Sequence, residues 1–315
     1  MELYAILKIV WAAVLGVLFI GLGTMVGMDM GVGTLLRFVG RNDGERRTAL
    51  NIIGPHWDGN QVWFILGGGA IFAAFPTLYG TSFSAFYVVM ITLLFSMILR
   101  PVAFEYRSKA DSTLWRASWD WVFLVSGFVP MFIYGAAFGN VLEGVGYHFG
   151  WTGQYYQDES FLFYLLNPFA ILCGLMSVGL SVYQGGAMLM LRADETIWSR
   201  ARRYAIGGGL AAATLFVIGG IWVQFLPGFV MTAPVNPAMP ANPLHGQSVV
   251  MVAGGWMHNF HAHPALWMLP LVGLGCMLAG VAMLASGRTV AAWWLGLGAW
   301  AVSYTHLTLP TILLV

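Results

Sequence analysis

The chain has 315 residues, of which 59% are apolar and only 9% carry a formal charge, and its net charge is +1. Soluble domains carry about a quarter charged residues, so this composition excludes a soluble globular protein and predicts a surface that mostly contacts lipid. The near-neutral balance, without a long basic run, also argues against a nucleic-acid partner.

Apolar stretches long enough to cross a bilayer begin near the amino terminus. The 20 uncharged residues between Lys8 and Asp29 match the length that a helix needs to cross about 30 Å of hydrocarbon. We interpret this stretch as a membrane helix and not a secretory signal, because Glu2 stands where a basic residue is expected and no A-x-A cleavage site follows. The 41 uncharged residues from Gly59 to Leu99 suffice for two spans, with a turn predicted at Pro76–Gly80.

Five further spans are predicted downstream. Trp121–Leu142 gives the fourth and Ser160–Leu191 the fifth, with Pro168 in its first turn or at a kink. The 84 uncharged residues between Arg203 and Arg288 hold two more, and an eighth apolar segment follows Arg288. The predicted fold is therefore an all-α, polytopic transmembrane bundle of about eight spans. An extended, polyproline-like connection is expected inside the long stretch, at Pro234, Pro237, Pro240 and Pro243.

The positions of the cations predict the orientation, because Lys and Arg in short loops stay on the cytoplasmic side. The connection Glu143–Glu159 contains neither residue, so we expect it and the amino terminus outside the cell. All cations except Lys8 fall in alternate connections, which we expect inside: Arg37, Arg41, Arg46 and Arg47; Arg100, Arg107, Lys109 and Arg116; Arg192, Arg200, Arg202 and Arg203; and Arg288.

Glycines and histidines were weighed as candidate binding residues. Gly23, Gly27 and Gly31 recur every four residues, which indicates close helix packing and not a nucleotide site. The run Gly67–Gly69 admits either a neighbouring helix or a bulky prosthetic group of a partner, and the residues do not decide between these. His258, His261 and His263 could bind a metal or haem iron, but they lie in an external connection, so a surface role is favoured. The cysteines, Cys173 and Cys276, form no paired motif and are expected to be buried thiols.

Charged residues at the ends of the apolar runs are the candidate functional set. Asp29, Asp58, Arg100 and Asp120 all fall toward the predicted cytoplasmic ends of their spans. In the structural interpretation, Arg100 neutralises Asp29 or Asp120, and Asp58 and Asp120 cap their own helices. In the functional interpretation, which we favour for Asp58, this carboxylate beside His56 takes up and releases protons from the cytoplasm.

Several motifs together resemble subunit II of the cytochrome bd ubiquinol oxidases. They are Gly27–Gly33 (GMDMGVG), Arg41–Arg47 (RNDGERR), Gly54–Trp63 (GPHWDGNQVW), Arg100–Lys109 (RPVAFEYRSK), Trp119–Trp121 (WDW) and Leu166–Pro168 (LNP). The resemblance implies a partner, subunit I, that carries the quinol site and ligates three haems, two b-type and one d-type. It implies a complex in the bacterial inner (cell) membrane that oxidises quinol, reduces O2 to water and takes the protons from the cytoplasm.

The resemblance also implies roles for this chain. It would ligate no haem or metal and hold no catalytic residue of its own, and it would serve assembly and proton delivery. Asp58 and His56 would form the proton path. Membrane lipid and small single-helix subunits are further expected partners. A buried charged network would comprise Asp29, Arg100, Glu105 and Asp120.

The carboxyl-terminal end departs from the family pattern of nine spans. The eighth span is expected to break off near Val302, so we divide the chain into a transmembrane domain, 1–302, and a probable non-native tail, 303–315. Two rival functions were considered. A secondary transporter would place polar residues at mid-membrane in broken helices of both halves, and a self-sufficient haem or metal protein would use the external histidines.

Overall fold

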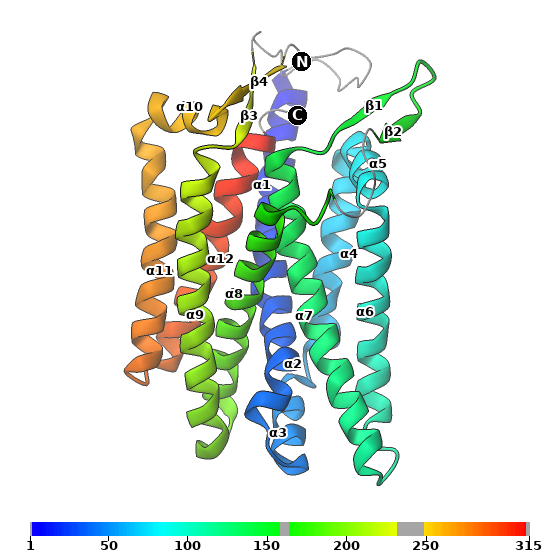
Figure 1. The fold of residues 1–315 in the computed structure, drawn as a ribbon, viewed down its shortest axis with the longest axis vertical. Helices are drawn as coiled ribbons and strands as arrows, with labels where there is room; N and C mark the ends of the chain where they lie inside the picture. Colours follow the sequence, from blue (N-terminus) through cyan, green and yellow to red (C-terminus); the bar gives the residue numbers. More distant parts are fainter. Residues whose placement is uncertain (1, 158–163, 232–248, 313–315) are drawn as a thin grey trace.

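The computed structural model describes residues 2–157, 164–231 and 249–312. Long helices run side by side along one axis and alternate in direction (Figure 1). Six of them are long and apolar enough to cross a membrane, judged by length and composition: Leu3–Val39, Tyr87–Tyr106, Thr113–Glu143, Pro168–Arg192, Glu195–Val223 and Pro264–Ala285. Together with the shorter apolar helix Thr289–Ser303, they confirm the predicted polytopic helical bundle.

The first helix is longer than predicted. Helix α1 (Glu2–Gly21) continues through a π-helical turn (Leu22–Val26) into α2 (Gly27–Val39). Asp29 lies inside this helix and does not end it, because the uncharged residues up to Leu36 extend the buried face. Gly40, in an extended conformation, ends the helix before α3 (Asp43–Ile53) begins.

The second and third predicted spans correspond to α4 (Trp57–Ala74) and α6 (Tyr87–Tyr106). The turn predicted at Pro76–Gly80 is wrong, because this segment starts a further helix, α5 (Pro76–Ala85). Proline suits the first helical position, where its missing N–H has no partner to lose. The chain therefore turns through a short helix on top of α4 and α6 (Figure 1).

The middle of the chain contains α7 (Thr113–Glu143), α8 (Pro168–Arg192) and α9 (Glu195–Val223). Between α7 and α8, strands β1 (Tyr147–Phe149) and β2 (Tyr155–Gln157) form an antiparallel hairpin. Pro168 is the first residue of α8, and the Asn167 side chain caps the helix by accepting a hydrogen bond from the Ala170 N–H at 2.6 Å. The proline therefore starts the helix and does not kink it. The first residues of the predicted fifth span, 160–163, lie outside the described residues.

The last part of the chain contains strands β3 (Pro227–Met231) and β4 (Val249–Ala253), α10 (Gly255–Ala262), a 3-10 turn (Pro264–Trp267), α11 (Met268–Ala285) and α12 (Thr289–Ile312). The expected polyproline-like connection, at 234–243, lies outside the described residues. Helix α12 extends past Val302, where we expected the span to end. Whether 303–315 is a non-native tail stays a prediction.

Glycines of the first long helix allow very close packing against α8 and α12. A Cβ atom at Gly31 would collide with the carbonyl oxygen of Ser181, and one at Gly185 would lie 2.5 Å from the Gly31 carbonyl carbon. Gly23 and Gly27 face the ring of Trp300 on α12, at 2.7 and 3.0 Å for their Cβ positions. The prediction that Gly23, Gly27 and Gly31 serve close helix packing is confirmed.

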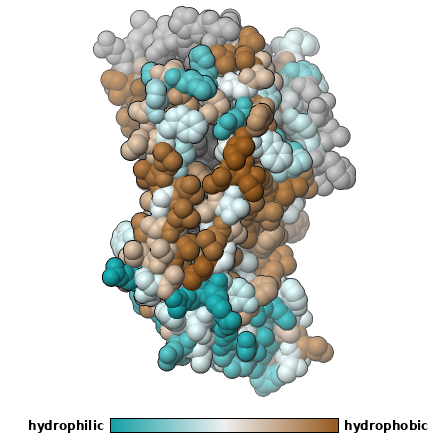
Figure 2. Space-filling view, turned by 60° about the vertical axis from the view of Figure 1, so that its left-hand side comes forward, coloured by the Kyte–Doolittle hydropathy of each residue, from teal (hydrophilic) through white to brown (hydrophobic). Residues whose placement is uncertain are grey.

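The polar and apolar surfaces are separated along the long axis. Figure 2 shows a broad apolar belt and a polar region below it. The connections that carry the arginines, α2 to α4, α6 to α7, α8 to α9 and α11 to α12, all lie at this lower end in Figure 1. We call it the arginine end. The hairpin β1–β2, strands β3 and β4 and α10 lie at the opposite end.

Candidate functional site

A buried carboxylate on α2 forms the centre of the first polar site. Asp29 is 1% exposed and lies in the first turn of α2. Its Oδ2 accepts a hydrogen bond from the Asn60 amide at 2.8 Å, and its Oδ1 lies 3.3 Å from Nδ1 of His56. The Asn60 amide also lies 3.2 Å from the same imidazole nitrogen. Three polar side chains from α2 and the start of α4 therefore form one connected group.

His56 is the most exposed partner of Asp29 in this group. Its side chain is 32% exposed, whereas that of its partner Asp29 is 1% exposed. The hydrogen bond to Asp29 raises the pKa of His56 above its ordinary value of 6.5, against the opposing effects of burial and of Arg192. Nδ1 of the imidazole faces Asp29, and Nε2 is buried without a hydrogen-bond partner among the described residues.

Asp58 was expected beside His56, and the structure places it differently. Asp58 is exposed in the first turn of α4, and His56 is the residue that precedes the helix. Within the described residues, Asp58 has no hydrogen bond or ion pair, so His56 contacts Asp29 and not Asp58. Sequence reasoning missed Asn60, although it lies one helical turn after His56, a spacing at which helical side chains meet.

Arg100 was expected to neutralise Asp29 or Asp120, and within the described residues it forms an ion pair with neither. Its guanidinium is buried at 1% exposure and donates a hydrogen bond from Nη1 to Sδ of Met30 at 2.8 Å. Asp29, the residue before Met30, interacts with it electrostatically. Arg100 therefore belongs to the surroundings of Asp29, but its closest partner is a thioether.

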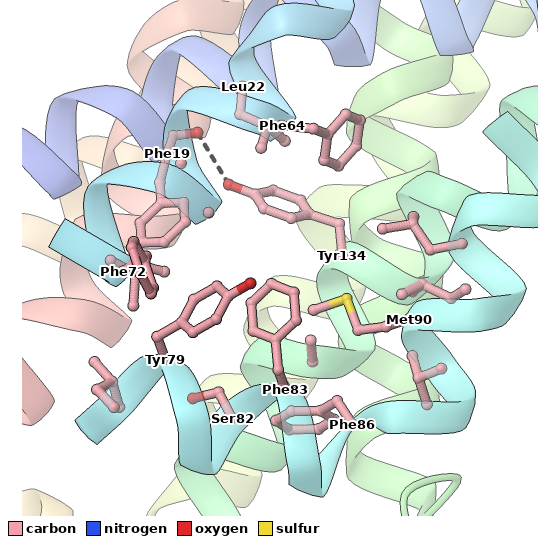
Figure 3. Close-up of a pocket in the computed structure, with 18 of the residues that line it drawn as sticks. Phe19, Leu22, Phe64, Phe72, Tyr79, Ser82, Phe83, Phe86, Met90 and Tyr134 are labelled. Carbon is pink, nitrogen blue, oxygen red and sulfur yellow. Dashed lines mark hydrogen bonds between the residues drawn. The ribbon is translucent and has the colours of Figure 1, made fainter. Parts of the chain in front are cut away.

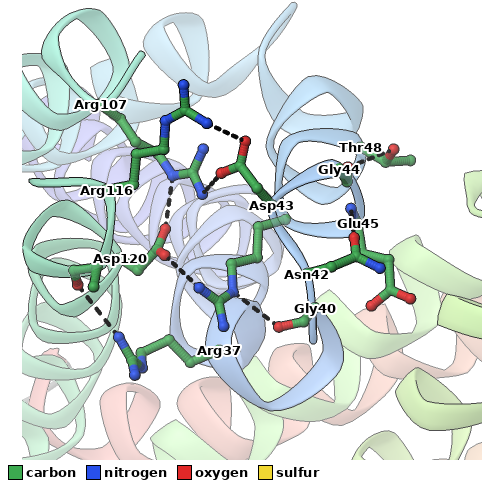
Figure 4. A network of polar contacts seen from close by, with 12 residues as sticks. Arg37, Gly40, Asn42, Asp43, Gly44, Glu45, Thr48, Arg107, Arg116 and Asp120 are labelled. Atoms are coloured by element: carbon green, nitrogen blue, oxygen red, sulfur yellow. Dashed lines mark hydrogen bonds and ion pairs between the residues drawn. The ribbon is translucent and has the colours of Figure 1, made fainter. Parts of the chain in front are cut away.

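A second polar site surrounds Asp120 (Figure 4). This carboxylate is fully buried and accepts hydrogen bonds from Arg46 at 2.9 Å and Arg107 at 2.7 Å. Arg107 also binds Asp43 at 2.8 Å, and Asp43 lies 3.0 Å from Arg116. The network joins α3, the end of α6 and α7. We call these five residues the Asp120 network.

Two predictions about this network are wrong. Asp120 does not cap its own helix, because α7 begins at Thr113 and is capped by Ser112. Glu105 is exposed and takes no part in the buried charges, because it lies on the outer side of the last turn of α6. Arg107, two residues later, is the buried charge instead, with 2% of its side chain exposed. No spacing rule separates these two positions, since both end the same apolar helix.

A large apolar cavity lies between α1, α4, α5, α6 and α7 (Figure 3). Its volume is about 970 Å³. Tyr134 donates a hydrogen bond from its hydroxyl to the Phe19 carbonyl at 2.9 Å, and Tyr79 turns its hydroxyl toward the interior. The run Gly67–Gly69 lines this cavity, so these glycines face a space and not a closely packed helix.

The donor side chains around the cavity, among the described residues, are Ser82, Met90 and tyrosines. Neither histidine nor cysteine, the usual imidazole and thiolate ligands of haem iron, lines it. His258, His261 and His263 lie at the far end, in or next to α10, and all three are exposed. Over the described residues, no group of three or more His, Cys, Asp or Glu side chains could hold a metal ion.

Comparisons with known proteins place the chain in one family. Residues 7–312 match the family model of cytochrome bd terminal oxidase subunit II. The chain is 42% identical over 312 residues to the cytochrome bd-I ubiquinol oxidase subunit 2 of Escherichia coli K12, covering 99% of this chain and 79% of that protein. It is 40% identical over 285 residues to a probable cytochrome oxidase subunit 2 of Haemophilus influenzae, covering 90% and 75% of the two chains.

The fold is also similar to that of a solved oxidase. The structure of bd oxidase from Geobacillus thermodenitrificans matches with a TM-score of 0.68 and covers 95% of this chain and 86% of that chain. At 9% identity this match supports the fold alone. The family model and the close relatives confirm the resemblance inferred from the motifs, and the chain belongs to the cytochrome bd terminal oxidase subunit II family.

Proposed function

We propose that this chain is the subunit of a terminal quinol oxidase that ligates no haem and supports a haem-bearing partner, subunit I. Family membership supports a role in a quinol:O2 oxidoreductase. Haem ligation is assigned to the partner, as the family resemblance implies. When bound there, the haems supply the electron transfer and the O2 chemistry. The residues of this chain then contribute assembly and the supply of protons.

The proton path is proposed to start at the arginine end, near Asp58 and His56. One observation carries this proposal: the buried Asp29 carboxylate is connected to the partly exposed His56 by direct contact and through Asn60. Asp58, two residues after His56, is exposed on the same first turn of α4. An exposed carboxylate can collect protons, and an imidazole can pass them on near neutral pH. The excess of cations at this end supports its placement in the cytoplasm.

The test uses the complex co-expressed with subunit I. Asp58→Asn is expected to lower quinol-dependent O2 uptake by about tenfold or more, because proton transfer by a positioned group contributes at least that much. Haem content, measured from the visible spectrum, should persist. The matched control is Asp111→Asn, which removes a fully exposed carboxylate at the same end and should leave uptake unchanged. Full turnover of the Asp58 variant would remove this residue from the path.

A second measurement tests where the haems reside. The chain purified without subunit I should show no Soret band, and a band that persists after washing would overturn the division of labour proposed above. A secondary transporter is not favoured, because the buried charges Asp29, Arg100 and Asp120 lie on α2, α6 and α7, in the amino-terminal half, and not in corresponding helices of both halves. If no co-purifying partner were found, the oxidase proposal would fail.

A further inference from the structure

An exposed aromatic pair joins α2 to α9 at the boundary between the apolar belt and the arginine end. The rings of Phe38 and Tyr204 lie 5.8 Å apart, and these residues are 49% and 41% exposed. Phe38 is next to last in α2, and Tyr204 directly follows the last arginine of α9. Aromatic side chains are favoured at this level of a membrane protein, where an apolar ring meets the headgroup layer.

Two exposed arginines flank this pair. Arg41 lies three residues after Phe38, and Arg203 directly precedes Tyr204. Neither guanidinium has a hydrogen bond or ion-pair partner within the described residues, in contrast to the arginines of the Asp120 network. We call Phe38, Arg41, Arg203 and Tyr204 the α2–α9 patch.

A clamp fixes the two halves of the patch relative to each other. The Glu45 carboxylate accepts a hydrogen bond from the Arg41 backbone N–H at 2.7 Å and from Nη1 of Arg200 at 2.8 Å. Arg200 lies one helical turn before Arg203 on α9. The hydrogen bond from Arg200 is the largest of the effects that lower the pKa of Glu45 to about 2, so this carboxylate is ionised and committed to the clamp. Among the described residues, it pairs with Arg200 and forms no ion pair with the guanidinium of Arg41 or Arg203.

We propose that the α2–α9 patch binds the headgroup of an anionic phospholipid of the membrane leaflet at the arginine end. The two guanidinium groups supply the positive charge that a phosphodiester requires, and the ring pair meets the glycerol and upper acyl region. A partner protein is a less suitable occupant, since two unpaired cations and two rings at headgroup depth match the lipid that already surrounds the bundle. This binding is independent of the proton path proposed above.

The experiment measures lipid retention by the purified complex with subunit I. After exchange into mixed phosphatidylglycerol and phosphatidylcholine nanodiscs and detergent release, native mass spectrometry counts the lipids that remain bound. The unmodified complex should retain phosphatidylglycerol in preference to phosphatidylcholine. The double variant Arg41→Gln/Arg203→Gln should bind phosphatidylglycerol about 30-fold more weakly, from the usual contribution of two cations near a membrane surface.

The matched control is Arg47→Gln/Arg288→Gln, which removes two exposed cations of the same end outside the patch. It should retain the lipid, and an equal loss in both double variants would overturn the proposal by showing general charge attraction. The variant Arg41→Lys/Arg203→Lys keeps both charges and should retain most binding. Equal retention of both lipids by the unmodified complex, or displacement of phosphatidylglycerol by inorganic phosphate alone, would also overturn it. Because no turnover is measured, failure here leaves the oxidase proposal intact.

Discussion

Helices α8 and α4 are both apolar and both rich in glycine, yet they are packed very differently. Most residues of α8 are buried inside the chain, and the helix contacts α2, α7 and α9 along its length. In α4, Gly67 is the one residue that is buried among those described. Away from the cavity, α4 instead exposes large side chains such as Val62 and Leu66.

The difference shows how small residues act in each half. Gly31 and Gly185 let the backbones of α2 and α8 approach until no Cβ would fit, so this half is a self-sufficient core. Gly69 on α4 has nothing within 4 Å of its Cβ position and lines the cavity instead. The half around α4 and α6 is therefore loosely packed around the cavity. Its outer face is left for lipid or a partner to cover.

The largest effect is expected from the Asp120 network, which joins the end of α6, in the loosely packed half, to α3 and α7. Asp120→Asn removes the carboxylate that compensates Arg46 and Arg107. Because breaking a buried ion pair leaves a charge uncompensated, we expect a loss of about 3–5 kcal/mol in the free energy of unfolding. Thermal unfolding of the purified complex measures it. Asp111→Asn, at an exposed pair, should change stability by less than about 1 kcal/mol, and equal effects of both changes would contradict this prediction.

The two glycine environments give the next largest effect. Gly31→Leu forces a side chain against the Ser181 carbonyl of α8, so we expect a loss of about 3 kcal/mol or more, as for overpacked cores. Gly69→Leu, in open space on α4, should leave stability unchanged or raise it by up to about 1 kcal/mol, because leucine is the better helix former and no atom blocks its Cβ. The yield and melting temperature of the complex measure both. If Gly69→Leu were as damaging as Gly31→Leu, the division into a closely packed half and a loosely packed half would be wrong.

A smaller, pH-dependent effect is expected at His56. Its pKa is raised in the folded protein, mainly by the Asp29 hydrogen bond, so its stabilising contribution is fully present below the ordinary value of 6.5 and is lost as the pH rises through the folded pKa. The difference in melting temperature between the unmodified chain and His56→Gln should therefore shrink as the pH rises above 6.5.

The smallest effect is expected at Glu45, with the opposite sign. The hydrogen bond from Arg200 leads the effects that lower its pKa from 4.5 to about 2, so its contribution is present above pH 4.5 and is lost as the pH falls toward about 2. Glu45→Gln should lower the melting temperature slightly at neutral pH, and the difference should decrease on acidification below about pH 5. A difference that grows on acidification would contradict the clamp.

Much of the fold could be predicted because bilayer thickness fixes helix length. The spacing of charges located the long helices, and the repeat at Gly23, Gly27 and Gly31 identified a packed face. The helix at Pro76–Ala85 was missed, because a proline and a glycine in an apolar stretch indicate a turn as readily as a short helix. The continuation of α2 past Asp29 was missed because a buried carboxylate with partners does not end a helix.

The site was predictable in composition but not in pairing. Asp29, Arg100 and Asp120 were singled out and are buried, yet each has a partner that the sequence did not indicate: Asn60, Met30 and Arg107. Pairing depends on the rotation of one helix against another, which no local spacing reports. The role of Asp58 and His56 in proton supply stays a prediction.

The π-helical turn at Leu22–Val26 determines how the side chains of α1 are rotated about the helix axis relative to those of α2. A π-helical turn accommodates one extra residue in the helix, and at 3.6 residues per turn one residue corresponds to a rotation of about 100°. Deleting a residue there would turn everything upstream relative to α2, so that Phe19 and Leu15 would leave the cavity wall while Gly27 and Gly31 kept their places. A single inserted residue thus lets one continuous helix direct one face toward the closely packed helices and another toward the cavity.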